Sequence, residues 1–451
     1  MRPSDFLLDT IVALATPAGK SAVALVRLSG PDARRVLACL APRLKSELKP
    51  RRPRLAALDD AAGERIDQGL VTFFAAPNSY TGEDVVEISI HGSPVAASRL
   101  IEAAIAAGAR AARPGEFTER AFRAGKLDLV RAEAVRDLIE AQTPAAARFS
   151  ARRMEGGLSK KLETAREDLL AAAAGIAAAI DFSDDVGETV DSEVERRLLA
   201  ATDLLARLSA TYKTGKLLSS GCRVAILGRP NAGKSTLFNA LVGSARAIVT
   251  EIPGTTRDTL ESVVEVRGIP VTVVDTAGLR ATEDVVEKIG VARAEEEAGR
   301  ADAVIYVYDA ANGFSAEDRE ALARRPETPR ILVANKSDLA PASPLVDGAV
   351  RLCGLEPTAG ERLRNLIADA VASEISTEKT SEVLGSLRQR DLVDRARAGA
   401  EQTLEALSGG HSPEYAATHC HAALDALADL VGETTSEDVL TRLFSTFCIG
   451  K

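Results

Sequence analysis

A glycine-rich turn that can cradle phosphate groups is the clearest chemical motif in the sequence. Residues 228–235, Gly-Arg-Pro-Asn-Ala-Gly-Lys-Ser, have the spacing GxxxxGK[ST], follow an apolar run at 224–227 and precede a helical pattern from Thr236. The glycines let backbone amides close around phosphate oxygens, and the helix N-terminus adds partial positive charge. Lys234 is placed to reach the β- and γ-phosphates, and Ser235 to bind Mg²⁺. The segment predicts a nucleoside triphosphate site.

Two further motifs follow apolar runs in the order that a GTP site requires. In Asp275-Thr276-Ala277-Gly278, the acid can hold the Mg²⁺ shell and the amide of the glycine can meet the γ-phosphate. In Asn335-Lys336-Ser337-Asp338, a carboxylate can accept hydrogen bonds from the N1 and N2 donors of guanine. Adenine offers no such pair of donors. The three motifs together predict that the nucleotide is GTP.

The catalytic positions depart from the Ras-like pattern. Leu279 stands where many small GTPases carry a glutamine that orients the attacking water, so another group must hold that water. An acidic segment at 283–287 fits a solvated helix start as well as a catalytic role. Pro230 and Asn231 stand where small glycines often sit, which hinders entry of an arginine finger. Asn231 is instead a candidate for holding a monovalent cation.

The pattern of apolar residues and turns divides the chain into segments of different texture. Short β-like runs at 11–14, 22–28, 70–74 and 85–90 alternate with turns, which is typical of an α+β domain. Helical spacing then follows, and it returns near the C-terminal end. Between these helical blocks, strands alternate with helices, as in a parallel sheet with crossover helices.

This alternation predicts a multidomain fold of α/β and α class. We expect an N-terminal α+β domain and a discontinuous helical domain, into which a Ras-like P-loop GTPase α/β domain is inserted. The expected domains are residues 1–122, residues 123–217 as the first helical part, residues 218–375 as the GTPase domain, and residues 376–451 as the second helical part.

The charge and aromatic content restrict how the chain can contact nucleic acid. The net charge is −9, which opposes a broad electrostatic grip on RNA. Aromatic residues make up 4% and tryptophan is absent, so base-stacking platforms are not expected. RNA contacts must therefore use local patches. One basic stretch at 110–131 fits a structural or solvated role slightly better than RNA binding. Its basic residues are Arg110, Arg113, Arg120, Arg123, Lys126 and Arg131.

The cysteine pattern and the apolar runs indicate a cytoplasmic protein without a membrane span. The five cysteines have no CxxC pair, which fits a reducing compartment. The longest uncharged apolar run, at 169–180, is shorter than the roughly 20 residues that a membrane span needs. His411, His419 and His421 gather around Cys420, but residues one or two apart on a helix face different directions, so ordinary helix side chains are favoured over a metal site.

Further motifs extend along the whole chain. They include Asp9-Thr10-Ile11-Val12-Ala13, Val26-Arg27-Leu28-Ser29-Gly30, Ser79-Tyr80-Thr81-Gly82-Glu83-Asp84, Ala112-Arg113-Pro114-Gly115-Glu116-Phe117-Thr118, Gly125-Lys126-Leu127-Asp128-Leu129, Gly254-Thr255-Thr256-Arg257-Asp258 and Phe447-Cys448-Ile449-Gly450-Lys451. A generic GTPase would share only the nucleotide motifs. With these motifs the chain resembles the MnmE/TrmE tRNA-modification GTPases, from Asp9 to its last residue.

The resemblance implies a potassium-stimulated GTPase whose GTPase domains dimerise across the nucleotide. It implies that Asn231 binds K⁺ together with oxygens of Thr250, Ile252 and Thr255, that Thr256 joins Ser235 on Mg²⁺, and that the catalytic Glu287 orients the water network. The implied nucleotide-binding residues are Asn231, Ala232, Gly233, Lys234, Ser235, Thr236, Thr250, Thr255, Thr256, Asp275, Thr276, Ala277, Gly278, Asn335, Lys336 and Asp338.

The resemblance also implies that the N-terminal domain binds a folate and forms a homodimer. The positions that match the family's site for 5-formyl- or 5,10-methylene-tetrahydrofolate are Arg27, Glu87, Lys126 and Lys451. A carboxylate can accept from the N–H groups of a pterin, and cations can meet its acidic tail. Cys448 matches the family's terminal cysteine, for which a packed thiol and a reactive thiol both stay open.

The implied substrate is the wobble uridine of certain tRNAs, which is modified at C5. The implied partner is the FAD-dependent protein MnmG, with which the chain would form a heterotetramer. Two other functions stay open: a GTP-switched ribosome or assembly factor, and a folate-dependent methyl or formyl transferase with a regulatory GTPase domain.

One departure from the family concerns the loop at the guanine edge. The family usually has Ser-Ala-Lys there, whereas the expected region in this chain is 351–355, Arg-Leu-Cys-Gly-Leu. Backbone amides can still serve the guanine carbonyl. We expect weaker nucleotide affinity or a less ordered loop.

Overall fold

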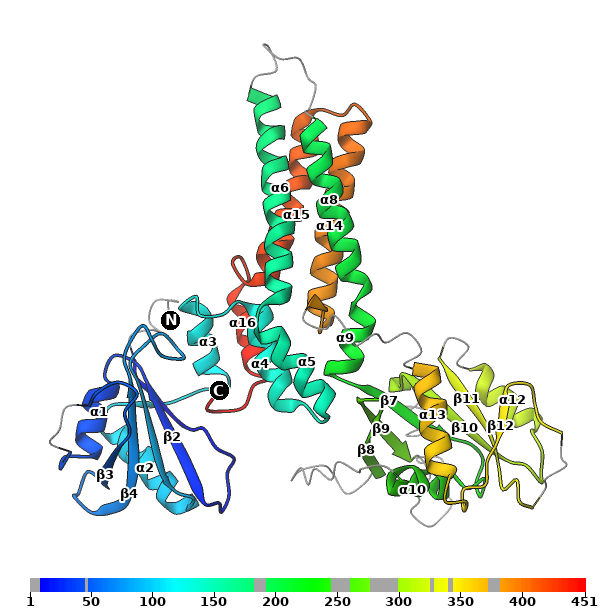
Figure 1. Cartoon of the computed structure of the whole chain (residues 1–451), viewed down its shortest axis with the longest axis horizontal. Coiled ribbons are helices and arrows are strands. Elements are labelled where there is room, and N and C mark those ends of the chain that lie inside the picture. The colour runs from blue at the N-terminus through cyan, green and yellow to red at the C-terminus, as the bar shows by residue number, and fades with distance from the viewer. Residues whose placement is uncertain are drawn as a thin grey trace. The chain divides into compact units, whose positions relative to one another are not determined.

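The computed structural model describes the chain as two compact units (Figure 1). The described residues are 9–44, 48–181, 192–244, 260–275, 299–324, 328–339, 344–371 and 382–451. The N-terminal unit combines the chain up to Arg136 with Leu424–Lys451, and the second unit is Asp137–Ala423. The domain boundaries expected from the sequence stay predictions.

The N-terminal unit is built on a six-stranded mixed sheet of order β3-β4-β5-β2-β1-β6. Neighbouring strands are antiparallel except for the parallel pair β1 and β6. The strands are β1 (Ile11–Leu14), β2 (Val23–Ser29), β3 (Arg54–Asp59), β4 (Arg65–Phe74), β5 (Val85–His91) and β6 (Arg110–Ala111). Four of these strands confirm the predicted β-like runs.

Helices cover one face of this sheet, because alternate strand residues are apolar. In β2, Val26 and Leu28 are buried in a core with residues of α1 (Ala33–Leu40) and α2 (Pro94–Ala106), whereas Arg27 points to the opposite, open face. Ser93 caps α2 by accepting from the amide of Ala96, and Pro94 occupies its first turn.

The C-terminal residues return to the N-terminal unit. There α16 (Glu437–Phe444) packs on α3 (Glu116–Arg123), and Ile449 forms a bridge to Pro114. A Cβ on Gly115 would lie 2.5 Å from the carbonyl oxygen of Phe444, and its φ of +67° also favours glycine. The turn that starts α3 therefore requires glycine in order to hold the C-terminal segment.

Long helices and a second sheet form the other unit. Helix α8 packs against both α6 and α14, so helices from before and after the α/β segment lie together. The buried residues of α6 recur every three or four positions, as in Leu158, Leu162 and Ala165, which is the stripe of an amphipathic helix. The helices are α4 (Leu129–Glu140), α5 (Pro144–Met154), α6 (Gly157–Asp181), α8 (Ser192–Ala210), α9 (Tyr212–Ser219), α14 (Leu387–Ser408) and α15 (Pro413–Val431), of which α4 and α15 span the boundaries between the units.

The second sheet has the order β12-β11-β10-β7-β9-β8 and is parallel except for β8. This confirms the expected alternation of strands and crossover helices. Its elements are β7 (Cys222–Leu227), α10 (Lys234–Ser244), β8 (Leu260–Val266), β9 (Ile269–Asp275), β10 (Ala303–Asp309), α12 (Ala316–Ala323), β11 (Arg330–Asn335), β12 (Ala349–Arg351) and α13 (Ala359–Val371). None of the described helices combines the length and apolarity needed to cross a bilayer.

A buried arginine connects α5 to α4 and to the start of α14. Arg153 of α5 is fully buried, and its guanidinium donates to Asp137 at 2.6 Å and to Oε1 of Gln389 in α14 at 3.2 Å. The amide of Gly385 donates to the same Gln389 oxygen, and a Cβ on Gly385 would lie 2.2 Å from the guanidinium. Arg153 thus fixes where α14 begins relative to α5.

We expect Arg153→Ala to destabilise the second unit by about 3–5 kcal/mol, because it leaves the Asp137 carboxylate buried without this partner. Arg148→Ala is the matched control, since Arg148 lies exposed on the same helix. Urea unfolding followed by circular dichroism measures the difference. Equal midpoints for the two variants would contradict the role of Arg153.

Candidate nucleotide-binding site

The three sequence motifs meet at the carboxyl edge of the second sheet. Strand β7 lies between β9 and β10, so the strands that follow it in sequence are added first on one side of β7 and then on the other. Ligands of open α/β sheets bind at such a switch point. The turn 228–233 follows β7, Asp275 ends β9, and Asn335 ends β11. The topology therefore places phosphate, Mg²⁺ and guanine motifs along one edge.

The phosphate-binding turn has a backbone that only certain residues tolerate. Gly228 has a φ of +140°, and a Cβ there would lie 2.0 Å from the carbonyl oxygen of Val307. Gly233 has a φ of +92°, and a Cβ there would lie 2.1 Å from Nδ2 of Asn335. Asn231 also lies in the left-handed region, with a φ of +62°, and is exposed. These conformations wrap the turn tightly and leave Asn231 at its surface.

Lys234 is held against this turn. Its Nζ atom donates to the carbonyl oxygens of Gly228 at 2.7 Å and of Arg229 at 2.8 Å, and the side chain is buried. Ser235 follows it at the exposed start of α10, where the partial positive charge of the helix is greatest. The roles of the lysine in binding phosphate and of the serine in binding Mg²⁺ stay predictions.

Asn335 connects the phosphate-binding turn to the guanine-edge loop. Its Nδ2 donates to the carbonyl oxygen of Ala232 at 2.9 Å, and its Oδ1 accepts from the amide of Gly354 at 3.0 Å. Cys353 is buried, and the amide of Leu352 donates to Ala334 of β11. The loop without Ser-Ala-Lys is therefore anchored beside the guanine motif. Its effect on affinity stays a prediction.

A lysine–aspartate pair supports the guanine motif, and its aspartate was not predicted from the sequence. Lys336 has a φ of +58°, and its Nζ lies 2.9 Å from Oδ2 of Asp309 at the end of β10. Burial raises the pKa of Asp309, but the hydrogen bonds from Lys336 and from the amide of Ala311 outweigh it, so the pKa lies below its usual value. The feature of Asp309 that could have identified it is its place at the end of a strand. That strand, β10, lies beside β11, and Asp309 pairs in register with Asn335.

Of the remaining predicted nucleotide residues, some lie in the described part of the chain and others lie outside it. Asp275 is fully buried at the end of β9 and pairs in register with Ile226 of β7, whereas Asp338 is exposed in the turn after Asn335. Thr236 lies in the first turn of α10. The following predicted residues lie outside the described part of the chain: Thr250, Ile252, Thr255, Thr256, Thr276, Ala277, Gly278 and Glu287. Their roles stay predictions.

In the N-terminal unit, the structure brings together two of the four residues assigned to folate, and a third follows directly in sequence after a residue that contacts them. Arg27 and Glu87 are cross-strand neighbours on the open face, and Nε and Nη2 of the arginine donate to Oε1 of the glutamate at 3.0 and 2.8 Å. Nη1 of Arg27 also donates to the carbonyl oxygen of Gly450 at 3.2 Å, which places Lys451 next to this pair. Lys126 is exposed, and the structure gives it no contact with the other three residues.

Tyr80 borders the same site and was not predicted individually. Its hydroxyl lies 3.0 Å from the hydroxyl of Thr118. Burial raises the pKa of Tyr80, although the hydrogen bond with Thr118 and the charge of Arg27 act in the opposite direction. The Arg27 guanidinium also lies 5.7 Å from the ring centre of Phe117. The ring of Phe117 therefore lies beside the Arg27–Glu87 ion pair.

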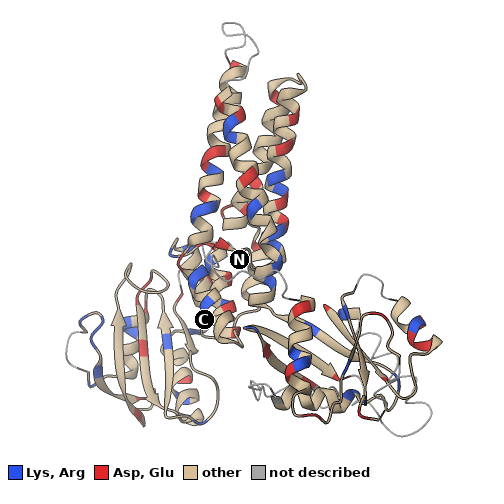
Figure 2. Ribbon diagram, turned by 45° about the vertical axis from the view of Figure 1, so that its right-hand side comes forward, with Lys and Arg blue, Asp and Glu red and all other residues tan. Residues whose placement is uncertain are grey.

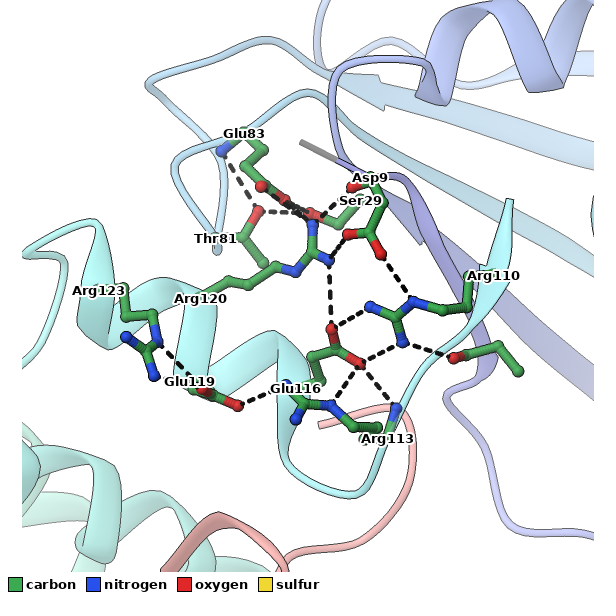
Figure 3. Close-up of polar contacts among 11 residues, drawn as sticks. Asp9, Ser29, Thr81, Glu83, Arg110, Arg113, Glu116, Glu119, Arg120 and Arg123 are labelled. Atoms are coloured by element: carbon green, nitrogen blue, oxygen red, sulfur yellow. Dashed lines mark hydrogen bonds and ion pairs between the residues drawn. The ribbon is translucent and has the colours of Figure 1, made fainter. Parts of the chain in front are cut away.

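The basic stretch at 110–131 is mostly an internal ion network (Figure 3). Arg120 is buried and contacts Asp9, Glu83 and Glu116, and Arg110 contacts Asp9 and Glu116. Burial raises the pKa of Glu116, but hydrogen bonds from Arg110 and Arg113 lower it more, to about 2. Arg113 and Arg123 pair with Glu119, and Arg123 also pairs with Glu437. These four arginines hold α3 in place, which agrees with the structural interpretation.

The cysteines and histidines named in the sequence analysis lie in different environments. Cys420 is buried, and its Sγ lies 3.6 Å from the carbonyl oxygen of Leu169 in α6; burial raises its pKa to about 11. The rings of His411 and His419 instead flank Tyr415 on the surface of α15. Cys448 is exposed. The choice between a packed and a reactive role for Cys448 stays open.

Comparisons with known proteins match nearly the whole chain. Residues 10–126 match the family model for the GTP-binding protein TrmE N-terminus, and residues 129–448 match the model for the MnmE helical domain. The tRNA modification GTPase MnmE of Aquifex aeolicus is 40% identical over 98% of this chain and 100% of its own length. That of Koribacter versatilis is 43% identical over 98% and 99%.

A solved structure, the G domain of the T. maritima FeoB iron transporter, is 27% identical and covers 33% of this chain and 98% of its own, with a TM-score of 0.24. That score is too low to bear on the fold.

We expect Gly233→Ala to weaken binding of a fluorescent GDP analogue by about 3 kcal/mol, which is about a hundredfold in Kd. The added methyl group would collide with Asn335 and meet an unfavourable φ. Gly243→Ala is the matched control, because a Cβ there meets nothing within 4 Å. If both variants bind the nucleotide as the wild type does, the tight contact between the turn and Asn335 does not govern binding.

Proposed function

The chain belongs to the MnmE family of tRNA modification GTPases and is a GTP-hydrolysing enzyme, and from this premise we propose its reaction in detail. It uses GTP hydrolysis, together with the FAD-dependent partner MnmG and a one-carbon folate, to modify C5 of the wobble uridine of certain tRNAs. The observation that supports GTP binding in this proposal is the pair of hydrogen bonds made by the Asn335 side chain. One bond reaches the phosphate-binding turn and the other reaches the guanine-edge loop, so both belong to one site.

Hydrolysis in this proposal depends on a monovalent cation. Asn231 is exposed on the phosphate-binding turn in a left-handed conformation, so its side-chain oxygen is available to a ligand beside the phosphates. Thr250, Ile252 and Thr255 supply the other oxygens. When bound, K⁺ supplies fixed positive charge beside the phosphates where negative charge develops in the transition state. This replaces the arginine finger that Pro230 and Asn231 hinder.

The remaining catalytic roles are divided among several side chains. Lys234 binds the β- and γ-phosphates, while Ser235 and Thr256 hold Mg²⁺ with Asp275 in the outer shell. Glu287 orients the attacking water and replaces the glutamine that Leu279 lacks. Asp338 accepts from guanine, and its exposed position in the turn after β11 leaves the carboxylate available to the base.

The folate site in this proposal is the open face of the N-terminal sheet around Arg27 and Glu87. Oε1 of Glu87 accepts both hydrogen bonds from Arg27, so its second carboxylate oxygen is available to the N–H groups of a pterin. The C-terminal segment closes one side of the site, because the carbonyl oxygen of Gly450 binds Arg27 and places Lys451 beside it. Lys126 is assigned to the site by resemblance alone.

The proposed assembly is a cytoplasmic homodimer that joins MnmG in a heterotetramer. Apolar side chains on the N-terminal sheet support a self-association surface. Val23, Leu55 and Leu70 are each about half exposed or more, and Leu55 and Leu70 are cross-strand neighbours. Large exposed apolar residues that lie together are typical of protein interfaces.

We expect GTP hydrolysis to be at least about tenfold faster in KCl than in NaCl of equal ionic strength, because the cation stabilises transition-state charge. Asn231→Ala should abolish this difference. Glu287→Ala should slow hydrolysis in both salts while GDP affinity stays intact. Phosphate release by the purified chain measures the rates.

Asn239→Ala is the control for this experiment, because it makes the same substitution at an exposed position of α10 for which no cation contact is predicted. Equal slow rates in both salts for the wild type would contradict cation dependence. Turnover that instead rises on ribosomes would favour the GTP-switched ribosome or assembly factor.

We expect Glu87→Gln to weaken binding of 5-formyl-tetrahydrofolate by about 1.5–3 kcal/mol, because a charged acceptor for the pterin is lost. Asp32→Asn is the matched control, since Asp32 pairs with Arg35 in an exposed ion pair of the same unit. Isothermal titration measures both affinities. A Kd that Glu87→Gln leaves unchanged would remove Glu87 from the folate site.

A further inference from the structure

One segment of this acidic chain is strongly basic. Residues 34–54 contain eight Lys or Arg side chains and one acid, Glu47, in a chain whose net charge is −9. The segment runs from α1 to the start of β3 in the N-terminal unit. None of the motifs assigned to nucleotide or folate falls within it. Its charge is therefore not explained by the proposed sites.

Five of its basic residues form an exposed surface that we call the edge patch. They are Arg34, Lys49, Arg51, Arg52 and Arg54. In the part of the chain that the structure describes, no acid lies within 4.0 Å of their charged nitrogens, whereas Arg35 pairs with Asp32 and Arg43 lies 3.8 Å from Asp59. The charge of the edge patch is thus left for another molecule to neutralise.

Contacts around β4 bring these residues together. The Arg34 guanidinium lies 5.1 Å from the ring centre of Phe73, and the amide of Arg51 donates to the carbonyl oxygen of the same phenylalanine at 2.7 Å. Arg54 begins β3 and pairs in register with Val71, two residues before Phe73 on β4. The edge patch therefore lies along the β3 edge of the sheet, where Figure 2 shows lysine and arginine in blue.

Residues 49–53, which carry Lys49, Arg51 and Arg52 of the edge patch, have a restricted backbone before any partner binds. Pro50 and Pro53 each restrict one backbone angle. Arg51 has a φ of +60°, which is uncommon for a residue with a Cβ, and its guanidinium donates to the carbonyl oxygen of Asn78 at 3.1 Å. The cost of ordering this loop on binding is correspondingly small.

The four arginines between residues 110 and 123 do not have this character. Arg110, Arg113, Arg120 and Arg123 contact acids in the network of Figure 3. Their charge is neutralised within the unit. The stretch at 110–131, which the sequence analysis weighed as an RNA contact, is thus less available to phosphate than the edge patch.

We propose that the edge patch binds the sugar-phosphate backbone of the tRNA substrate, an inference that rests on the proposed function. Guanidinium and ammonium groups match phosphate oxygens, and such contacts position a nucleic acid without reading its sequence. Between the cations of the loop lie Pro50 and Pro53 rather than the aromatic anchors of a protein interface. Because the rest of the chain is acidic, the patch also determines which face meets the RNA.

The test combines Lys49→Ala, Arg52→Ala and Arg54→Ala in the full chain. Arg51 is kept because its backbone conformation supports the loop. Each phosphate contact contributes about 0.7–0.9 to the slope of log Kd against log salt, so this slope should fall by about 2–3. Fluorescence anisotropy with a labelled tRNA transcript, titrated from low to high KCl, should also show at least about tenfold weaker binding at low salt.

A variant of equal net charge separates the edge patch from general electrostatics. It combines Arg207→Ala, Arg319→Ala and Arg324→Ala, all exposed positions of the second unit. This control should keep the wild-type affinity and salt slope, and GTP hydrolysis without tRNA should be unchanged in both variants.

The proposal that the edge patch binds tRNA would be overturned if the patch variant kept the wild-type tRNA affinity. It would also be overturned if the control variant lost as much tRNA affinity as the patch variant. In the first case, weaker binding of the variant to the protein partner would assign the surface to a protein instead. If the wild-type chain binds no tRNA, the proposed substrate is overturned together with the patch.

Discussion

The nucleotide site depends on one side-chain amide. Asn335 ends β11, yet its two polar atoms reach Ala232 on the phosphate-binding turn and Gly354 on the guanine-edge loop. An amide can do this because it presents a donor and an acceptor on one rigid plane, whereas a carboxylate of the same shape would repel the carbonyl oxygen of Ala232. Phosphate binding and base recognition are therefore not independent, because displacing either loop breaks a hydrogen bond of the same residue.

Charged side chains in the N-terminal unit occur in two opposite environments, one buried and paired and the other exposed and without an acidic partner among the described residues. Arg120 and Glu116 are buried, which is tolerated because each has several oppositely charged partners; an isolated charge there would destabilise the unit strongly. Arg52 and Arg54 are exposed and have no acidic partner among the described residues, so water alone solvates them. The first arrangement rigidifies α3 beside the Arg27–Glu87 pair. The second leaves charge for a ligand. Sequence counts of basic residues do not distinguish the two.

Local sequence predicted much of the fold. It predicted the nucleotide site only where the spacing of residues in a motif determines the geometry of that motif. The short apolar run of β2 and the Gly-Lys-Ser turn identified their elements, because strand burial and phosphate binding restrict which residue types can stand there. Strand β3 was missed, since its Arg-Leu-Ala-Ala-Leu-Asp sequence is short and only weakly patterned. Asp309 and Tyr80 were missed as site residues because their roles arise from neighbours distant in sequence. Such contacts become visible only when the strand order is known.

The same strand order connects the nucleotide site to the helices. Strand β9 carries Asp275 at one end and begins at the hairpin turn with Gly268. The Thr143 hydroxyl caps α5 by accepting from the amide of Ala146 and donates to the carbonyl oxygen of Gly268 at 2.7 Å. A Cβ on Gly268 would lie 2.9 Å from Cβ of Ala145, so the contact is close. A shift of β9 along its axis would therefore strain this cap at the start of α5, the helix that also carries Arg153.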